Sequence, residues 1–507
     1  MKLFLAPSRC SCETRHNIKR YVNSVNEAGT FGCHVEYNFI TEKGDEEAMG
    51  NKSKKQSTRS SQDYASPTSD IVFVTSKKRL ISNTGTAIIG MLLRHSGLKD
   101  ELKKLGKLPQ QKHDHFSCLA SYISLLCQGY TAFEDSREML DDVSYYCRAL
   151  QTNSIPSPET LRQRMDILGS QLHEGDLLQR VNQRMLVSTK AKVSAAFSGH
   201  FPIDIDVSVH DNSDTKKEGV ARAYNGIDGY APIYAYLGME GFLINTQLRC
   251  GTDHSQNIKT LKFLEDTIEL AKGIVSGDIL VRMDSGNDSK DNIRICSDKK
   301  VHFLIKRNLR SERVEDWWDT AFLGASTEET PREGKKVYTG YELRNLGMSR
   351  PVKLVYQVTV RTIDRKGQIL LVPDIDVQTW WTDLELSPQE VIRLYHEHAT
   401  CEQFHAEIKT DIGLERFPSG HFNTNGAVLK QAMMAYNILR IIGQTSLLQS
   451  EQQLTSHKVF RIRAKTVMKK IVLIAGHVVS HARQFIVDLG RSNIWRNVFR
   501  DVYTSFA

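Results

Sequence analysis

The order in which two hydrophobic periods alternate along the chain is the feature that most constrains its fold. Apolar residues recur at helical spacing from about 80 to 186, for example in IIGMLLRHSGL (88–98) and FSCLASYISLLCQGY (116–130). From 201 to 309 the pattern changes to strand alternation, interrupted by one helical stretch at 258–272. Helices, then strands around a helix, then helices again predict an α/β protein whose mixed sheet is flanked by helical regions.

Composition excludes several classes of protein. A length of 507 residues predicts more than one structural unit. The longest apolar stretch without charge, near 471–479, is far shorter than the ~20 residues that span a bilayer, and the first residues lack the apolar block of a secretory signal. The nine cysteines are odd in number and scattered, which indicates reduced thiols. We therefore expect a cytoplasmic protein without membrane contact.

Shifts in composition predict the domain boundaries. Residues 41–70 are rich in Ser, Lys, Asp and Glu, which indicates a flexible linker. The last 57 residues carry ten basic and three acidic side chains, so they hold almost all of the net charge of +8. The predicted segments are a leader and linker at 1–75, a helical N-terminal domain at 76–195, the first part of a core at 196–310, a β-rich insertion without helical period at 311–385, core helices at 386–449 and a basic helical region at 450–507.

Two predicted strands carry acidic residues. In FPIDIDVSVH (201–210) alternation places Asp204 and Asp206 on one face and the branched apolar residues on the other. In DILVRMDSGND (278–288) Asp284 follows a continuous apolar run, at the carboxyl end of a strand, where open α/β sheets place their sites. A half-exposed strand and a turn-forming aspartate produce the same local patterns.

A polar stripe follows one face of the helix predicted after 387. At 100° per residue, four side chains fall within an arc of roughly 60°: Tyr395, His398, Glu402 and Lys409. A second set, which is centred on a different face, can pack against the sheet: Cys401, Phe404 and Ile408. A solvated helix face also carries polar residues, so the stripe has an alternative explanation.

These acids suit phosphodiester chemistry. Cleavage by two divalent ions about 3.5–4 Å apart needs carboxylates from several elements. Mg²⁺ takes only one or two carboxylates and keeps several waters, so three acids are enough. Lysine, histidine and tyrosine side chains nearby can hold phosphate oxygens.

The motifs together resemble the DDE transposases of bacterial insertion sequences, in the branch marked by Tyr-x2-Arg-x3-Glu-x6-Lys and close to the insertion sequence 1380 type. Here the signature reads Tyr395-x2-His398-x3-Glu402-x6-Lys409. IDIDVS (203–208), VRMDSG (281–286) and the segment at 413–439 resemble the family's neighbouring motifs in the same order. Two departures are His398 in place of Arg and Asn287 in place of an aromatic residue.

The resemblance implies an RNase H-like catalytic core with the β-rich region inserted before the Glu helix. Asp206, Asp284 and Glu402 would bind two Mg²⁺ ions, with Mn²⁺ as a substitute. Asp206 is preferred as the first of these acids, because the first acid of the family lies two residues before a small hydroxyl residue. Asp204 stays the alternative. The resemblance also implies that Tyr395, His398 and Lys409 contact DNA phosphates. At position 398, the arginine of the family would bind phosphate more firmly than the histidine of this chain.

The activity implied is cut-and-paste transposition. An activated water would cleave at a terminal inverted repeat, and the freed 3′-OH would attack target DNA. One expected partner is double-stranded DNA, which the N-terminal domain, with Arg162 and Arg164, and the basic tail would contact. The other is a second copy of the chain in a homodimer, and the DNA-bound protein is expected on the bacterial nucleoid. The alternatives are a transposase-derived DNA-binding protein without catalysis and a metal-dependent phosphoesterase.

Overall fold

The computed structural model describes residues 22–25, 31–34, 75–105, 113–253, 258–348, 350–449, 459–481 and 484–507. The chain forms two units, Met1–Thr75 and Ser76–Ala507. In the first unit, β1 (Val22–Val25) pairs antiparallel with β2 (Phe31–His34). The flexible linker expected at 41–70 lies outside the described residues. Among the helices of the described ranges, none has the length and apolar character needed to cross a bilayer.

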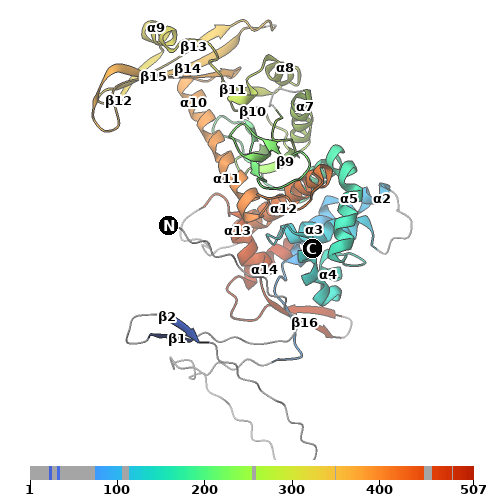
Figure 1. Cartoon of the computed structure of the whole chain (residues 1–507). Helices are drawn as coiled ribbons and strands as arrows, with labels where there is room; N and C mark the ends of the chain where they lie inside the picture. Colours follow the sequence, from blue (N-terminus) through green and yellow to red (C-terminus); the bar gives the residue numbers. More distant parts are fainter. Residues whose placement is uncertain are drawn as a thin grey trace, which may run out of the picture. The chain divides into compact units, whose positions relative to one another are not determined.

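The second unit begins with helices, as the hydrophobic period predicted (Figure 1). The elements are β3 (Arg79–Ile81), α1 (Thr86–Ser96), α2 (Leu98–Lys104), α3 (His115–Leu126), the 3-10 helix η1 (Phe133–Asp142), α4 (Val143–Leu150), α5 (Pro158–Glu174) and α6 (Leu177–Ser188). Helix α5 starts where the sequence indicated, because Ser157 accepts a hydrogen bond from the amide of Thr160 and Pro158 occupies the first turn.

A nine-stranded mixed sheet forms the centre of this unit, in the order β12-β13-β14-β15-β11-β10-β4-β8-β9. The strands that carry the acidic motifs lie in its middle. The part of the sheet before the insertion, with its connecting helices, consists of β4 (Phe201–Val207), β8 (Ile233–Leu237), β9 (Phe242–Gln247), α7 (Ile258–Lys272), β10 (Ile279–Met283), η2 (Ser285–Asn287), α8 (Lys290–Asp298) and β11 (His302–Arg307). Strands β4, β8 and β9 are antiparallel, whereas β10 and β11 run parallel to β4 and to each other. The mixed α/β architecture expected from the sequence is confirmed.

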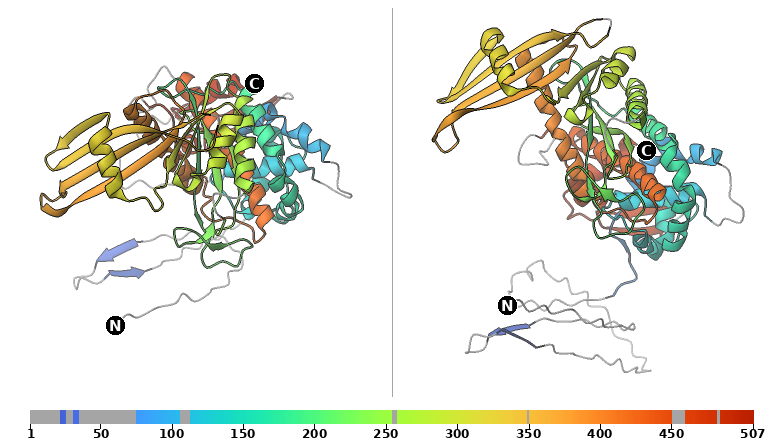
Figure 2. Two further views of the ribbon diagram at one scale, coloured as in Figure 1. Left: turned by 90° about the horizontal axis from the view of Figure 1, so that it is seen from above. Right: turned by 45° about the horizontal axis from the view of Figure 1, so that its top comes forward.

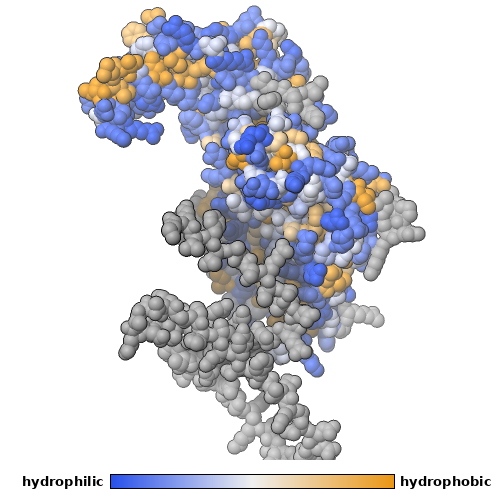
Figure 3. All heavy atoms as spheres, viewed as in Figure 1, coloured by the Kyte–Doolittle hydropathy of each residue, from blue (hydrophilic) through white to orange (hydrophobic). Residues whose placement is uncertain are grey.

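The insertion extends this sheet. It contains α9 (Val314–Gly324), β12 (Thr327–Arg332), β13 (Lys335–Arg344), β14 (Val352–Ile363) and β15 (Ile369–Thr382). Since β15 pairs with β11, the inserted strands continue the central sheet and project beyond the core (Figure 2). Exposed apolar side chains gather over these strands, among them Leu343, Ile369 and Leu371 (Figure 3).

The absence of helical period predicted for 311–385 is wrong at α9. Glu315 and Asp316 lie in the first turn of this helix, where acidic side chains interact favourably with the helix dipole. Trp317 and Ala321, four residues apart, form its buried stripe. The helix packs on the inserted strands β13, β14 and β15 through this narrow stripe.

A broken helical segment connects the insertion to a long central helix. Its parts are α10 (Pro388–His396), the 3-10 turn η3 (Glu397–Thr400), α11 (Cys401–Ala406), the π-helical turn η4 (Glu407–Asp411) and α12 (Phe422–Gln449). Helix α12 is buried on all sides over most of its length and packs against α5 and β9, so it joins the N-terminal helices to the sheet.

The prediction of a wholly helical C-terminal region is wrong in part. Helix α13 (Ala464–Val467), the π-helical turn η5 (Met468–Val472) and α14 (Arg496–Ser505) form as helices. Between them, β16 (Gly476–His481) and β17 (Gln484–Asp488) form a hairpin, and β16 also pairs with β3. The burial of β16 alternates along Gly476–Val479, which is the period of a strand at the edge of the core.

Candidate functional site

The first two predicted acids lie level with each other at the carboxyl ends of neighbouring strands. Strands β4 and β10 are parallel, and their last paired residues are Ile205 and Met283. Asp206 is the next residue of β4, and Asp284 directly follows the end of β10; neighbouring strands lie about 4.8 Å apart. Side chains at paired positions share a face of the sheet, so the two carboxylates are brought together.

The alternative acid, Asp204, is committed to a buried ion pair. Arg282, its paired residue on β10, donates from Nε to Oδ1 at 2.6 Å and from Nη2 to Oδ2 at 2.8 Å. His398 Nδ1 lies 3.0 Å from the same Oδ1. Burial alone would raise the pKa of Asp204, but Arg282 and His398 together hold it below its usual value. Both oxygens of Asp204 therefore already face a cation.

Asp206 is held in place by its neighbours. Its Oδ1 accepts a hydrogen bond from the amide of Val207 at 2.8 Å, and its Oδ2 lies 3.1 Å from His405 Nε2. The other ring nitrogen of His405 lies 3.0 Å from the hydroxyl of Tyr236. Burial would raise the pKa of Asp206, but the hydrogen bond and charge of His405 and the charge of His398 lower it. Asp206 is therefore an oriented carboxylate that stays ionised.

Asp284 has the opposite electrostatic setting. Burial, followed by the charge of Asp206, raises its pKa above the usual value, and the hydrogen bond from Asn287 only partly opposes this. That bond runs from Asn287 Nδ2 to Asp284 Oδ1 at 2.7 Å. The Oδ1 of Asn287 is buried and has no hydrogen-bond partner within the described ranges. Two adjacent carboxylates and an unpartnered amide oxygen form a site short of positive charge.

Glu402 lies on the helical segment that covers this edge of the sheet. Its side chain is exposed, and it makes no hydrogen bond or ion pair with the residues that the structure describes. His398 and His405, on either side of it in sequence, contact Asp204 and Asp206, so the segment docks directly over β4. Phe404 packs against Gly241, where a Cβ would lie 2.2 Å from the ring. This close approach brings α11 down onto the sheet.

The polar side chains predicted along this helix differ in their burial. His398 is buried, whereas Glu402 is exposed. The segment also changes its winding at the 3-10 turn η3 and at the π-helical turn η4, on either side of α11. The packing face was predicted correctly, since Cys401, Phe404 and Ile408 are each 1% exposed.

Tyr395 and Lys409 lie at the border of the site. Tyr395 is half-buried against Trp380, with ring centroids 5.8 Å apart, and burial and the charges of Asp284, Asp206 and Asp204 raise its pKa. Lys409 is also half-buried and donates a hydrogen bond to the carbonyl of Val209. Burial lowers the pKa of Lys409 while the charges of Glu415 and Asp206 oppose that change. Both side chains are thus within electrostatic reach of Asp206.

Three residues of the site were missed from the sequence. Arg282 gave a usable signal, because an arginine inside an apolar strand needs a buried acidic partner. His405 gave none, since helical phase alone does not reveal its contact with Asp206. Tyr224 lies in the loop between β6 (Ala221–Arg222) and β7 (Asp228–Tyr230). The protein around its phenol, then Asp206 and Asp284, raise the pKa of Tyr224, although the residue as a whole is 77% exposed.

Among the described residues, one group of three possible metal-ligand side chains has its ligand atoms close together. The side chains of Asp204, His398 and Cys401 offer ligand atoms within 4.8 Å of one another, and all three residues are buried. Arg282 already occupies both oxygens of Asp204, and burial raises the pKa of the Cys401 thiol, so this set does not suit a cation. The three acids predicted from the sequence, Asp206, Asp284 and Glu402, are not brought this close together, although their carboxylate oxygens are the type of ligand that suits Mg²⁺ or Mn²⁺.

Comparison with known proteins decides the class. The chain matches the family described as transposase DDE domain group 1 over residues 67–507. It belongs to that family. The resemblance to DDE transposases is confirmed at this level, and membership implies an enzyme of the nuclease and transposase class.

Other comparisons add little. No curated protein matches the chain. Among solved structures, the chain is similar to a cryo-EM structure of the piggyBac transposase synaptic complex with hairpin DNA, at 8% sequence identity and a TM-score of 0.35. The match covers 84% of this chain and 81% of that chain. The likeness is distant.

Proposed function

We propose that this member of the DDE family is a DNA transposase of the insertion sequence 1380 type, which cleaves DNA at terminal inverted repeats and joins the ends to target DNA by a cut-and-paste route. The observation that carries the proposal is the level pair of Asp206 and Asp284 on adjacent parallel strands, covered by the segment that bears the exposed Glu402. The mixed arrangement of β4, β8, β9, β10 and β11 supports an RNase H-like core.

In this proposal Asp206, Asp284 and Glu402 hold two Mg²⁺ ions, with Mn²⁺ as a substitute. When bound, the ions would polarise the scissile phosphate and activate the attacking oxygen. The protein's own part is positioning: His405 orients Asp206, Asn287 orients Asp284, and the buried amide oxygen of Asn287 can accept a hydrogen bond from a water in the site.

Tyr395, His398 and Lys409 are proposed to contact DNA phosphates at the border of this site. Lys409 donates to the carbonyl of Val209, just after β4, and Tyr395 packs on Trp380 of β15, so both side chains lie against the sheet that carries Asp206. His398 uses Nδ1 for Asp204, so Nε2 is the atom that we assign to phosphate. With one nitrogen engaged inside the protein, His398 also fixes the helical segment to β4.

DNA recognition is proposed to involve the N-terminal helices and the basic C-terminal region. Arg164 is buried and Arg162 pairs with Glu159 and Asp166, so the two arginines singled out from the sequence are poorly placed for it. Exposed cations of the C-terminal region are better placed, among them Lys469, Arg491 and Arg496. Joining two DNA ends calls for a homodimer, and the exposed apolar residues of the insertion favour contact with a second copy.

The test is cleavage of end-labelled DNA taken from the two flanks of the gene, with and without Mg²⁺. Asp284→Ala or Glu402→Ala should lower cleavage roughly 10³-fold, since each removes several kcal/mol of charge stabilisation, and should leave gel retardation intact. Glu385→Ala, which removes another exposed glutamate just before α10, is the matched control. Binding without any metal-dependent cleavage would indicate a non-catalytic DNA-binding protein, and turnover of free nucleotides instead would indicate a phosphoesterase.

A further inference from the structure

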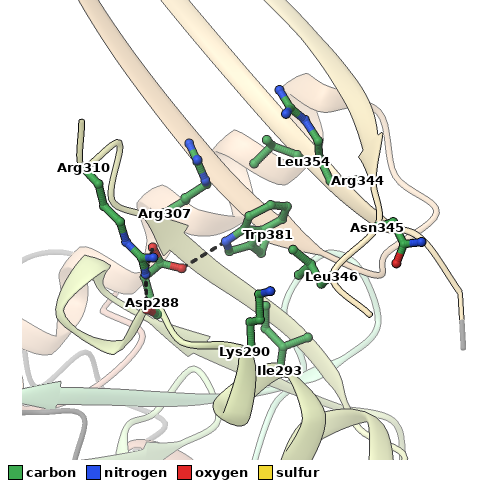
Figure 4. Close-up of a pocket in the computed structure, with 10 residues that line it drawn as sticks. All are labelled: Asp288, Lys290, Ile293, Arg307, Arg310, Arg344, Asn345, Leu346, Leu354 and Trp381. Carbon is green, nitrogen blue, oxygen red and sulfur yellow. Dashed lines mark hydrogen bonds and ion pairs between the residues drawn. The ribbon is translucent and has the colours of Figure 1, made fainter. Parts of the chain in front are cut away.

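A cavity of about 270 Å³ lies beside the candidate site, where the core meets the insertion (Figure 4). Four cationic side chains from three segments line it: Lys290 of α8, Arg307 and Arg310 at and after the end of β11, and Arg344 at the end of β13. Such convergence is unusual for cations, which repel each other unless an anion lies between them. The cavity is therefore a candidate anion site.

Two of the four cations are fixed and two are available. Arg307 is held by Glu312 at 2.8 Å, and Arg344 by Glu342 at 2.6 Å. Lys290 is exposed and has no hydrogen bond or ion pair with any residue in the described ranges. The side chain of Arg310 is 67% exposed, and its contacts among the described residues are long ones to Asp288, at 3.2 Å to the backbone carbonyl and 3.4 Å to the carboxylate. A ligand would meet mainly Lys290 and Arg310.

The floor of the cavity contains Trp381 and Asp288. Trp381 is 7% exposed, and its Nε1 donates to Asp288 Oδ1 at 3.0 Å. The guanidinium of Arg307 lies over its ring, 5.4 Å from the centroid. Asp288 also accepts from the amide of Asn308 at 3.1 Å, so this carboxylate faces protein donors on both oxygens. Asp288 is the one acid of the lining and its charge opposes an anion, but four cationic side chains outnumber it and Trp381 shields part of the floor from solvent.

The position of the cavity relative to Asp284 indicates which anion it would meet. Asp288 follows Asp284 by four residues, which span at most about 14 Å. Asn287, the residue that orients Asp284, immediately precedes Asp288. One DNA strand rises about 3.4 Å per nucleotide, so a phosphate in the cavity would lie within about four nucleotides of a phosphate at Asp284.

We propose that this cavity binds a backbone phosphate of the DNA strand that passes Asp284, with Lys290 and Arg310 as its ligands. The inference rests on the proposed function, since it assigns a second contact to the same DNA. Free phosphate and nucleotides carry the same chemistry, but the closeness to Asp284 favours a phosphodiester of the bound strand. A phosphate seated here would fix the register of that strand over the acids.

The test compares two double variants in which the same charge is removed from the same two segments. Lys290→Ala with Arg310→Ala empties the cavity of its available cations. Arg294→Ala with Arg313→Ala removes two neighbouring exposed arginines that do not line it and that pair with Asp291 and Glu315. Anisotropy of a fluorescein-labelled duplex from the gene's flank is measured in EDTA from 50 to 300 mM NaCl, so that no cleavage occurs. The charge-conserving variant Lys290→Arg with Arg310→Lys serves as the rescue.

For the cavity variant we expect the slope of log affinity against log salt to fall by about 0.9, the value for one lost phosphate contact, with the control and rescue variants close to wild type. Sodium phosphate or dTMP at matched ionic strength should not displace the duplex. Equal losses in both double variants, or displacement by either small anion, would overturn the assignment while leaving the proposed function intact. Failure of the wild-type protein to bind the duplex at all would overturn both.

Discussion

Replacing Arg282 by methionine should expose how strongly the site depends on one buried guanidinium. Arg282 contacts Asp204 on β4, belongs to β10 and donates to the carbonyl of Leu394 on α10 at 2.7 Å. Strand β4 carries Asp206, whereas β10 and α10 precede Asp284 and Glu402 in the chain. In Arg282→Met the carboxylate of Asp204, 2% exposed, keeps only His398 as a partner.

Removing one partner of a buried ion pair costs about 3–5 kcal/mol. For a unit of about 430 residues with an unfolding entropy near 2.1 cal/mol/K per residue, that is a fall in Tm of about 3–6 °C by calorimetry. The double variant Arg282→Met with Asp204→Leu should recover most of it, because replacing both charges by apolar groups is close to neutral. Equal losses of stability in the single and double variants would refute this reasoning.

The pH dependence of that loss is a second readout. In the wild type, Arg282 and His398 lower the pKa of Asp204, so the pair's contribution is present above the unfolded pKa and is lost as pH falls through the folded one. In Arg282→Met, burial dominates and raises the pKa, so the variant gains stability as Asp204 is protonated. The Tm difference between the two proteins should therefore shrink from pH 7 to pH 4; a constant difference would contradict the assignment.

Three further outcomes follow from the site. Asp284→Asn should raise the Tm in EDTA at pH 7.5, because burial and Asp206 raise the pKa of Asp284, so that its charged form opposes folding. This gain in Tm should vanish near pH 4, and a lower Tm at pH 7.5 would contradict the prediction. Glu402→Gln should abolish cleavage but change the Tm by less than about 1 °C, since the side chain is exposed and unpaired among the described residues. A large change in Tm would indicate a structural role for Glu402. His405→Phe should lower cleavage by about 10–100-fold and raise the Mg²⁺ concentration needed for half-maximal rate, because His405 orients the carboxylate of Asp206. An unchanged Mg²⁺ titration would show that His405 does not position a metal ligand.

The sequence predicted those features that depend on local period. Alternation placed Asp204 and Asp206 on one face of a strand, and helical spacing identified the buried side of α11 through Cys401 and Phe404. What separates Asp204 from Asp206 is the register of β4 against β10, which pairs Asp204 with Arg282 across 78 residues. Local patterns carry no information on such a register.

Two other features also depend on long-range contacts. The 3-10 and π-helical turns on either side of α11 depart from 100° per residue, which a regular helical period does not predict. Strand β16 is specified by its partner β3, almost four hundred residues earlier in the chain. The contact of His405 with Asp206 arises only once α11 is docked.

The central claim is that Asp206, Asp284 and Glu402 hold the same pair of divalent ions. A structure of the protein with Mn²⁺ and a duplex from the gene's flank, with Mn²⁺ located by anomalous scattering, tests it most directly. We predict two peaks about 3.5–4 Å apart, within ligand distance of oxygens from all three residues. A peak at Asp204, His398 and Cys401, or peaks that Glu402 does not reach with DNA bound, would contradict the claim.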